Sequence, residues 1–208
     1  MMAFLPEADK RTAALPLRAL SSQAAAAMVL VVLMVCTRGQ HMATVNALPS
    51  ASWAVFFLAG LLLRPAWMFA LLFGLATALD FGSYASGTIT DWCLSPAYWV
   101  LIPAYGSLWL AGRIYAGMHR SHWSTLPRLA CVLVVAAFVA YLVSGGGYYV
   151  FSGHYQPTVA GFLPRIAHYY PRSLGTMSGY IAVVVAAYEA IHWGMVRWSV
   201  HAQREVRL

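Results

Sequence analysis

Charge is scarce in this sequence. Of its 208 residues, 9% are charged and 61% are hydrophobic, whereas an ordinary soluble domain carries about 25% charged residues. There are 6 acidic residues, and Lys10 is the only lysine. A composition this poor in charge excludes an ordinary soluble domain and favours a protein that crosses a membrane several times.

Lysine and cysteine are too few for two familiar kinds of site. A phosphate-binding loop that hydrolyses ATP needs the pattern Gly-x-x-x-x-Gly-Lys-Ser/Thr, but Lys10 stands in "PEADKRT". The 3 cysteines, Cys36, Cys93 and Cys131, form no Cys-x-x-Cys pair, so the sequence does not favour a structural zinc site. The net charge of +7 comes from basic residues spread between apolar runs, and this spread excludes nucleic-acid binding.

Long apolar runs divide the chain into candidate membrane spans. Each run is expected to be helical, because lipid offers no partner for a free backbone N–H or C=O. The predicted fold class is an all-α membrane protein, with six transmembrane helices in a single domain over residues 1–208. The spans are predicted at residues 19–36, 50–63, 66–84, 96–117, 127–151 and 174–197. The first is expected to be retained, because "LMVCTRGQH" offers no signal-peptide cleavage site.

The basic residues set the direction of the spans. With both termini in the cytoplasm, ten of the 13 basic residues lie inside and three, Arg38, Arg165 and Arg172, lie outside. Cytoplasmic segments of membrane proteins are enriched in Lys and Arg, so this orientation is predicted. The outer side then carries three loops, at residues 37–49, 85–95 and 152–173.

Polar and reactive side chains gather at this outer side. Asp80 lies near the outer end of the third span, Tyr84 follows it by one helical turn, and Tyr98 opens the fourth span. His41 and Cys93 lie in the first and second outer loops. A carboxylate at the membrane centre costs about 2.5–3.5 kcal/mol, so Asp80 is predicted to serve a ligand or a polar network. The plainer alternatives are a water-exposed cap for Asp80 and a solvated loop side chain for His41.

Cys93, in "TDWCLSPAYW", permits several interpretations. Its thiol can be a small packing group, or it can form a disulfide with Cys36 on the oxidising side of the membrane. It can also be a soft metal ligand or a nucleophile. In the sixth span, Glu189 and His192 are expected to form a structural polar pair.

The third outer loop is rich in aromatic residues. Gly145, Gly146 and Gly147 precede it, and Pro157, Pro164 and Pro171 interrupt it. Such a loop is predicted to order over a large ligand, with an aromatic belt at the membrane interface as the alternative. The aromatic residues, with those of its approaches, are Tyr148, Tyr149, Phe151, His154, Tyr155, Phe162, His168, Tyr169 and Tyr170.

A single thiol restricts the metal chemistry. A bare metal ion needs three or four protein ligands, whereas a metal held by a macrocycle needs only an axial ligand, as haem iron does. Cobalt in a corrin ring has the same requirement. The six spans, with "QHMATVNALPSASWAVFFLAG", "ATALDF" and "TDWCLSPAYWVLIPAYGSLWLAGR", resemble the BtuM family of cobalamin transporters, which are solitary substrate-binding components of the ECF type.

The resemblance implies an S-component-like six-helix bundle in a bacterial inner membrane, with cobalamin bound at the periplasmic face. Cys93 matches the residue that coordinates cobalt in that family, and His41, Asp80 and Tyr98 match polar residues of the same region. Tyr84 joins this predicted set because it shares a helix face with Asp80. The resemblance and the softness of a thiolate ligand together lead to the hypothesis that Cys93 removes cyanide from cyanocobalamin.

The partner implied by the resemblance is an ECF energising module of two ATPases and a scaffold protein, or no protein at all. Family members usually carry an Ala-x-x-x-Ala motif in the first helix for docking. Here the run Ala24–Ala27 is followed by Met28, so the strict spacing is not met. Both possibilities therefore stay open, with cobalamin and the lipid bilayer as the remaining partners.

Two functions of other classes are alternatives. Cys93, His41 and Asp80 are the residue types of a cysteine nucleophile, a base and an orienting acid, as in a membrane acyltransferase or protease. A haem-binding electron carrier is the second alternative, and it would use His41 with His154 or His168. An acylating probe should label Cys93 in the enzyme, and a haem protein should show a Soret band.

Overall fold

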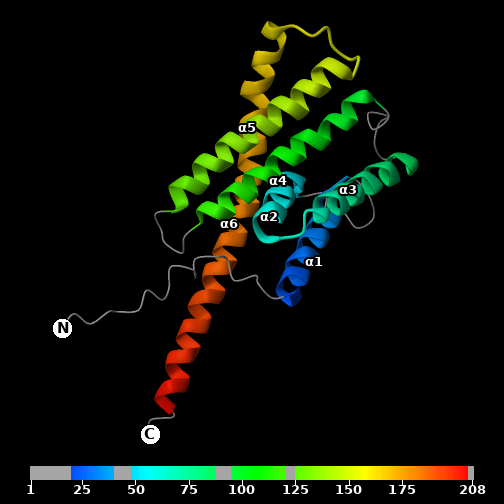
Figure 1. Cartoon of the computed structure of the whole chain (residues 1–208). Coiled ribbons are helices and arrows are strands. Elements are labelled where there is room, and N and C mark those ends of the chain that lie inside the picture. Colours follow the sequence, from blue (N-terminus) through cyan, green and yellow to red (C-terminus); the bar gives the residue numbers. More distant parts are fainter. Residues whose placement is uncertain (1–19, 40–47, 88–94, 120–124, 206–208) are drawn as a thin grey trace, which may run out of the picture.

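Helices make up the regular structure of the described chain. The computed structural model describes residues 20–39, 48–87, 95–119 and 125–205 (Figure 1). Within these ranges the chain forms six α-helices and a short 3-10 helix, η2, and no strand. The bounds are Leu20–Thr37 for α1, Ser52–Leu62 for α2, Trp67–Ala85 for α3, Pro96–Val100 for η2, Leu101–Met118 for α4, Leu126–Phe151 for α5 and Val159–Glu205 for α6. The predicted all-α class is confirmed for these residues.

Two helices of the described chain are long and apolar enough to cross a membrane, namely α3 and α5. α1 and α2 are apolar but shorter over their described residues. α2 has 11 residues, which is about 16 Å of helix and half of a hydrocarbon core of about 30 Å. These two helices give weak support to the membrane class.

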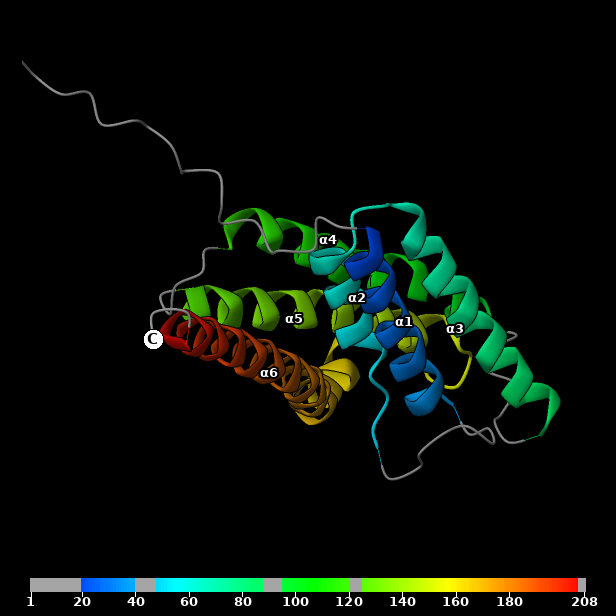
Figure 2. The same cartoon turned by 90° about the horizontal axis from the view of Figure 1, so that it is seen from below.

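α2 lies at the centre of the bundle. Every residue from Ala54 to Gly60 is buried, and the helix contacts α1, α3, α4 and α6. In the view from below, α2 lies between α1 and α4 (Figure 2). Its sequence, "SWAVFFLAGLL", is apolar on nearly all sides, which is typical of a helix enclosed by other helices. This enclosed helix fills the space between its neighbours.

Two glycines bring α2 and α4 into close backbone contact. A Cβ atom added at Gly60 of α2 would collide with the backbone carbonyl of Trp109. One added at Gly112 of α4 would collide with the backbone carbonyl of Phe57. Small residues permit such close helix crossings within membranes. The crossing therefore depends on hydrogen as the side chain at both positions.

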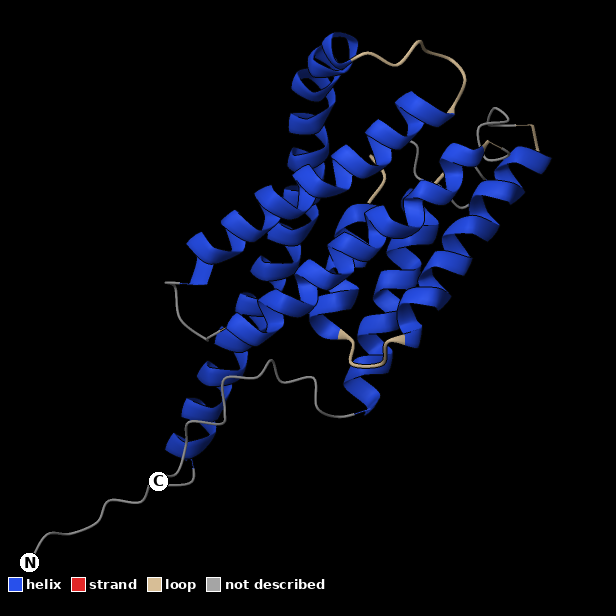
Figure 3. Ribbon diagram, turned by 45° about the horizontal axis from the view of Figure 1, so that its top comes forward, coloured by secondary structure: helices blue, strands red, loops and turns tan. Residues whose placement is uncertain are grey.

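α6 departs most from the predicted spans. It has 47 residues, or about 70 Å of helix, and begins at Val159 rather than at residue 174. Most of the predicted loop 152–173 is thus helix, and the prediction of a loop ordering over a ligand is wrong from Val159 onward (Figure 3). Proline removes a helix hydrogen bond, so Pro164 and Pro171 suggested a break, but both lie inside α6. Rings of Phe162 and Tyr170 contact Tyr141 of α5 and hold this part of α6 in place.

Gly112→Ala should destabilise the protein by about 1–3 kcal/mol, the usual cost of overpacking. The added methyl group meets the backbone of α2, which cannot rotate away. Gly106→Ala in the same helix is the matched control, because a Cβ there meets nothing within 4 Å and alanine favours helix over glycine. Unfolding in detergent measures both variants, and equal stability of the two would contradict the close crossing.

Candidate functional site

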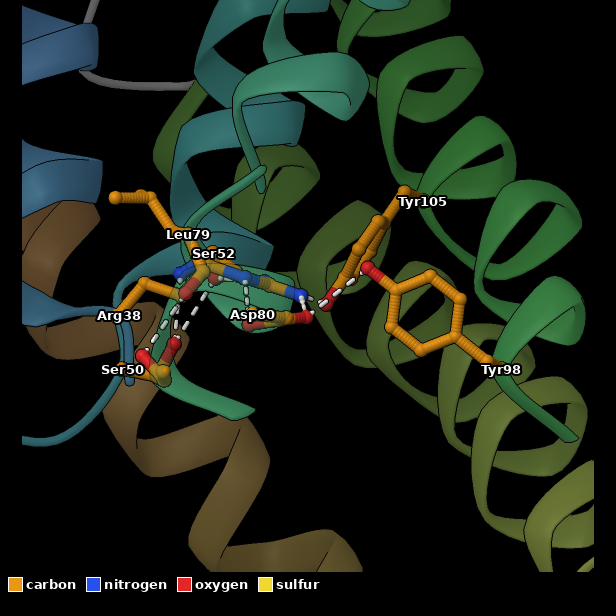
Figure 4. A network of polar contacts seen from close by, with 8 residues as sticks. Arg38, Ser50, Ser52, Leu79, Asp80, Tyr98 and Tyr105 are labelled. Carbon is orange, nitrogen blue, oxygen red and sulfur yellow. Dashed lines mark hydrogen bonds and ion pairs between the residues drawn. The ribbon is translucent and has the colours of Figure 1, made fainter. Parts of the chain in front are cut away.

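A buried arginine joins several helix ends at one end of the bundle. Arg38 is the first residue after α1, and 6% of its surface is exposed. Its Nε donates to Oδ1 of Asp80 at 2.9 Å, and its Nη2 donates to Oδ2 of Asp80 at 2.7 Å. Its Nη1 donates to Ser52 Oγ at 2.7 Å and to the Tyr105 hydroxyl at 2.9 Å (Figure 4). One guanidinium thus contacts α2, α3 and α4.

Asp80 completes the group by accepting a further hydrogen bond. The Tyr98 hydroxyl donates to its Oδ2 at 3.1 Å, and both residues are buried, with exposed fractions of 4% for Asp80 and 0% for Tyr98. A planar guanidinium matches a carboxylate through two parallel hydrogen bonds. Buried charges are costly unless they are paired and hydrogen-bonded, and here both conditions are met. We call Arg38, Ser52, Asp80, Tyr98 and Tyr105 the polar network.

Short hydroxyl side chains form hydrogen bonds between the end of α1 and the start of α2. The backbone N–H of Ala51 donates to Thr37 Oγ1 at 3.1 Å, next to the bond between Arg38 and Ser52. The hydroxyls of Ser50 and Ser52 lie 2.9 Å apart. Ser and Thr favour helix ends because they bond nearby backbone groups there. The chain therefore leaves α1 and enters α2 at two points that are tied together.

η2 carries Tyr98 and is held from two sides. The Tyr98 ring meets Phe81 of α3 edge to face, with ring centroids 5.8 Å apart. On the other side, a Cβ added at Gly147 of α5 would collide with the Val100 side chain, so the glycine makes room for η2. The position of the Tyr98 hydroxyl therefore depends on both α3 and α5.

The predicted binding residues fall into two groups. Asp80 and Tyr98 are brought together, but inside the buried polar network. Tyr84 lies near the end of α3 with 37% of its surface exposed, and within the described residues no side-chain hydrogen bond joins it to the network. His41 and Cys93 lie outside the described residues. The sequence alone shows that they follow or precede network residues closely.

Three members of the network were not predicted as site residues. Arg38 is predicted only to be a charge of the outer side, and no role is predicted for Ser52 or Tyr105. The sequence does contain a signal for the role of Arg38. It directly follows an apolar run, and the predicted orientation places it on the same side of the membrane as the end of the third span, which carries Asp80. Ionisable residues within membrane segments commonly pair with one another, so the carboxylate of Asp80 called for such a partner.

Other predicted groups stand apart from the network. The thiols of Cys36 and Cys131 are free, and Cys36 is half-buried on α1. The side chains of Glu189 and His192 lie outside the described residues, so their predicted pairing does too. In the described part of the chain, no group of three His, Cys, Asp or Glu residues could hold a metal ion.

Arg38→Met should cost about 3–5 kcal/mol of stability, because it leaves the Asp80 carboxylate buried without its partner. The double variant Arg38→Met with Asp80→Leu should lose much less than the sum of the single losses. Denaturant unfolding in detergent completes the double-mutant cycle. Tyr98→Phe is the milder comparison, at about 1.5–3 kcal/mol for the loss of its hydrogen bond to a charged carboxylate. Additive losses at Arg38 and Asp80 would contradict a coupled pair.

Comparison with known proteins assigns nothing to this geometry. No known protein family matches the chain, and no curated protein matches it either. Function must therefore be inferred from the chain's own residues. The most informative are the polar network and the two neighbouring segments of the sequence that contain His41 and Cys93.

Proposed function

We propose that this chain binds cobalamin at the outer face of a bacterial inner membrane, with Cys93 as an axial ligand of cobalt, and mediates its uptake. The supporting observation is that the polar network fixes Arg38 and Tyr98 at one end of the bundle. His41 follows Arg38 by three residues, and Cys93 precedes Tyr98 by five. An extended chain spans at most about 3.6 Å per residue, so His41 lies within about 11 Å of Arg38 and Cys93 within about 18 Å of Tyr98.

The ligand that suits this arrangement is large and supplies most of its own metal ligands. A corrin ring holds cobalt in its plane and leaves the axial positions to other ligands. Haem binds its iron in the same way, so the protein needs to supply only an axial ligand. A cysteine thiolate is a soft ligand of the kind that later transition metals accept. Cys93 would occupy one axial position, and His41 would contact the corrin or its amide side chains. Asp80 and Tyr98 would act through the position of the chain beside them.

The proposed topology has six spans with both termini in the cytoplasm. α3 and α5 support the membrane part of the proposal by their length and composition. The excess of Lys and Arg on one side supports the direction. In that direction α1, α3 and α5 end, and α2, α4 and α6 begin, at the periplasmic face. The polar network then lies at this face.

Cyanide release is part of the proposal when the cargo is cyanocobalamin. The Cys93 thiolate displaces the vitamin's own base and forms a sulfur–cobalt bond with its electron pair. Donation from sulfur weakens the bond to cyanide on the opposite face. Cyanide leaves with its electron pair and takes a proton from water, while a water molecule enters the vacated position. Cobalt keeps its oxidation state, so the step needs no reductant.

The enzyme alternative receives less support from the geometry. A cysteine enzyme built on Cys93, His41 and Asp80 needs the carboxylate to orient the histidine. Both carboxylate oxygens of Asp80 already accept hydrogen bonds from Arg38, and one of them accepts another from Tyr98. The carboxylate is thus committed to the network. We therefore retain cobalamin binding as the proposal.

The proposal allows an energising module as partner, or none. The small residues of α1 face partly outward, since Ala24 and Ala25 are exposed. Beyond them Met28 and Val29 expose 64% and 62% of their surfaces. An exposed apolar face on this helix suits contact with lipid tails and with another apolar helix equally well. Uptake measured with and without an energising module distinguishes the two partners.

Cys93→Ser should abolish the change in the visible spectrum that cyanocobalamin undergoes on binding, together with any release of cyanide. A hydroxyl is a harder and far less ionised ligand than a thiol. Cys36→Ser is the matched control, because it removes a free thiol and should leave the spectrum unchanged. Titration of each purified variant gives spectrum and affinity. If the Cys93 variant binds cyanocobalamin with the same spectral change as the wild type, cobalt ligation by Cys93 is refuted.

Expression of the chain should restore growth of a cobalamin-dependent bacterial strain that lacks its own importer. The expected rescue occurs at low vitamin concentration and is weakened by Cys93→Ser, since that variant loses the cobalt ligand. Growth is compared at equal protein levels in the membrane, with and without an energising module. Failure of the well-expressed wild type in both backgrounds would argue against transport.

A further inference from the structure

A second arginine, Arg165, lies in the first turns of α6, near the end of α5 and at the same end of the bundle as the polar network. Arg165 of α6 is half-buried, and three tyrosine rings surround its guanidinium. The Cζ atom lies 4.4 Å from the ring centroid of Tyr155, 5.5 Å from that of Tyr169 and 5.7 Å from that of Tyr149. Cations within about 6 Å of an aromatic face are attracted to it. The rings therefore hold the guanidinium in place.

The three tyrosine rings hold the Arg165 guanidinium in place but do not neutralise its charge. Nη2 of Arg165 donates to the Tyr155 hydroxyl at 3.3 Å. Among the described residues no carboxylate pairs with Arg165, and Asp80 is already paired with Arg38. A guanidinium carries five N–H donors, so most of those of Arg165 remain for another acceptor. Its planar fork matches the oxygens of a phosphate group.

The backbone around Arg165 is tied to α5. The Tyr141 hydroxyl donates to the backbone carbonyl of Arg165 at 3.0 Å. The Tyr149 hydroxyl donates to the Gln156 carbonyl at 3.2 Å and accepts from the Thr158 N–H at 3.4 Å. A group held by its main chain and by its ring neighbours presents its remaining donors in a set direction. The arginine is therefore built into the fold.

This arginine is also joined to the candidate binding site. Tyr149, which contacts Arg165, follows Gly147 by two residues, and Gly147 packs against Val100 of η2. η2 in turn carries Tyr98 of the polar network. Figure 1 shows the end of α5 and the start of α4 at the upper end of the bundle, beside the connection to α6. A ligand large enough to cover this end would meet both sites.

We propose that Arg165 binds a phosphodiester, namely that of the nucleotide tail of bound cobalamin; this inference rests on the proposed function. When Cys93 displaces the vitamin's base from cobalt, the tail is released from the ring. Its phosphodiester is an anion, and Arg165 is the one described cation at this end that is both partly exposed and held by aromatic rings. The phosphate of a membrane lipid has the same chemistry, so the test separates the two sources.

The test compares cobalamin with cobinamide, a corrinoid that lacks the nucleotide tail, on the purified full chain in detergent. Arg165→Gln should weaken binding of cobalamin by about tenfold, the loss of a charge-assisted contact, and leave the affinity for cobinamide unchanged. Arg172→Gln is the matched control on the same helix and should change neither affinity. Binding of cobinamide also reports that each variant is folded.

Several results would overturn the inference. Equal losses for both corrinoids, or no loss for either, would show that Arg165 does not bind the tail. Failure of the wild type to bind either corrinoid would overturn the proposed function as well. If Arg165→Gln does not fold, Arg165→Lys keeps the charge and should retain part of the preference for cobalamin. An Arg165-dependent thermal shift with phosphatidylglycerol but not phosphatidylcholine, without a cobalamin effect, would assign the site to lipid.

Discussion

The buried ion pair between Arg38 and Asp80 is the constraint on which one end of the molecule depends. Each charge is too costly to bury alone, and the pair is stable only when its remaining hydrogen-bonding groups are satisfied. That requirement brings Ser52, Tyr98 and Tyr105 to the same place. Four separate segments of the chain must therefore converge before the network is complete. A binding site supported on such a base has fixed helix ends.

Two arginines at this end are held in opposite ways. Arg38 is enclosed and neutralised by a carboxylate at 2.7 Å. It therefore fixes the positions of the helix ends but contributes little to the electrostatic potential outside the protein. Arg165 is held by aromatic rings, which stabilise the cation without cancelling its charge. An approaching anion is attracted weakly by a neutralised arginine and strongly by an exposed one. A count of basic residues at this end gives both arginines equal weight. It therefore overstates the attraction by Arg38 relative to that by Arg165. The distinction comes from the neighbours of each side chain.

The sequence predicts the bounds of some helices closely, because a long apolar run within a membrane must be helical to satisfy its backbone hydrogen bonds. The run at 127–151 corresponds to Leu126–Phe151, and that at 66–84 corresponds to Trp67–Ala85. The start of α6 was missed because two prolines imitate a break, while the ring contacts that offset them join residues far apart in the chain. Asp80 stood out because an acid in an apolar run is costly. Its partner lies 42 residues away, and no periodicity reveals such a pair.

The burial of α2, Asp80 and Tyr98 divides the roles within the proposed site. α2 fills the centre of the bundle, and the two network residues are enclosed beneath the surface. A ligand as large as a corrinoid would then bind against the end of the bundle, and its direct contacts would fall to His41, Cys93 and Arg165. Asp80 and Tyr98 would influence binding through the chain that they hold. A polar residue in an apolar span thus has two possible uses, contact and position, and only its burial and partners distinguish them.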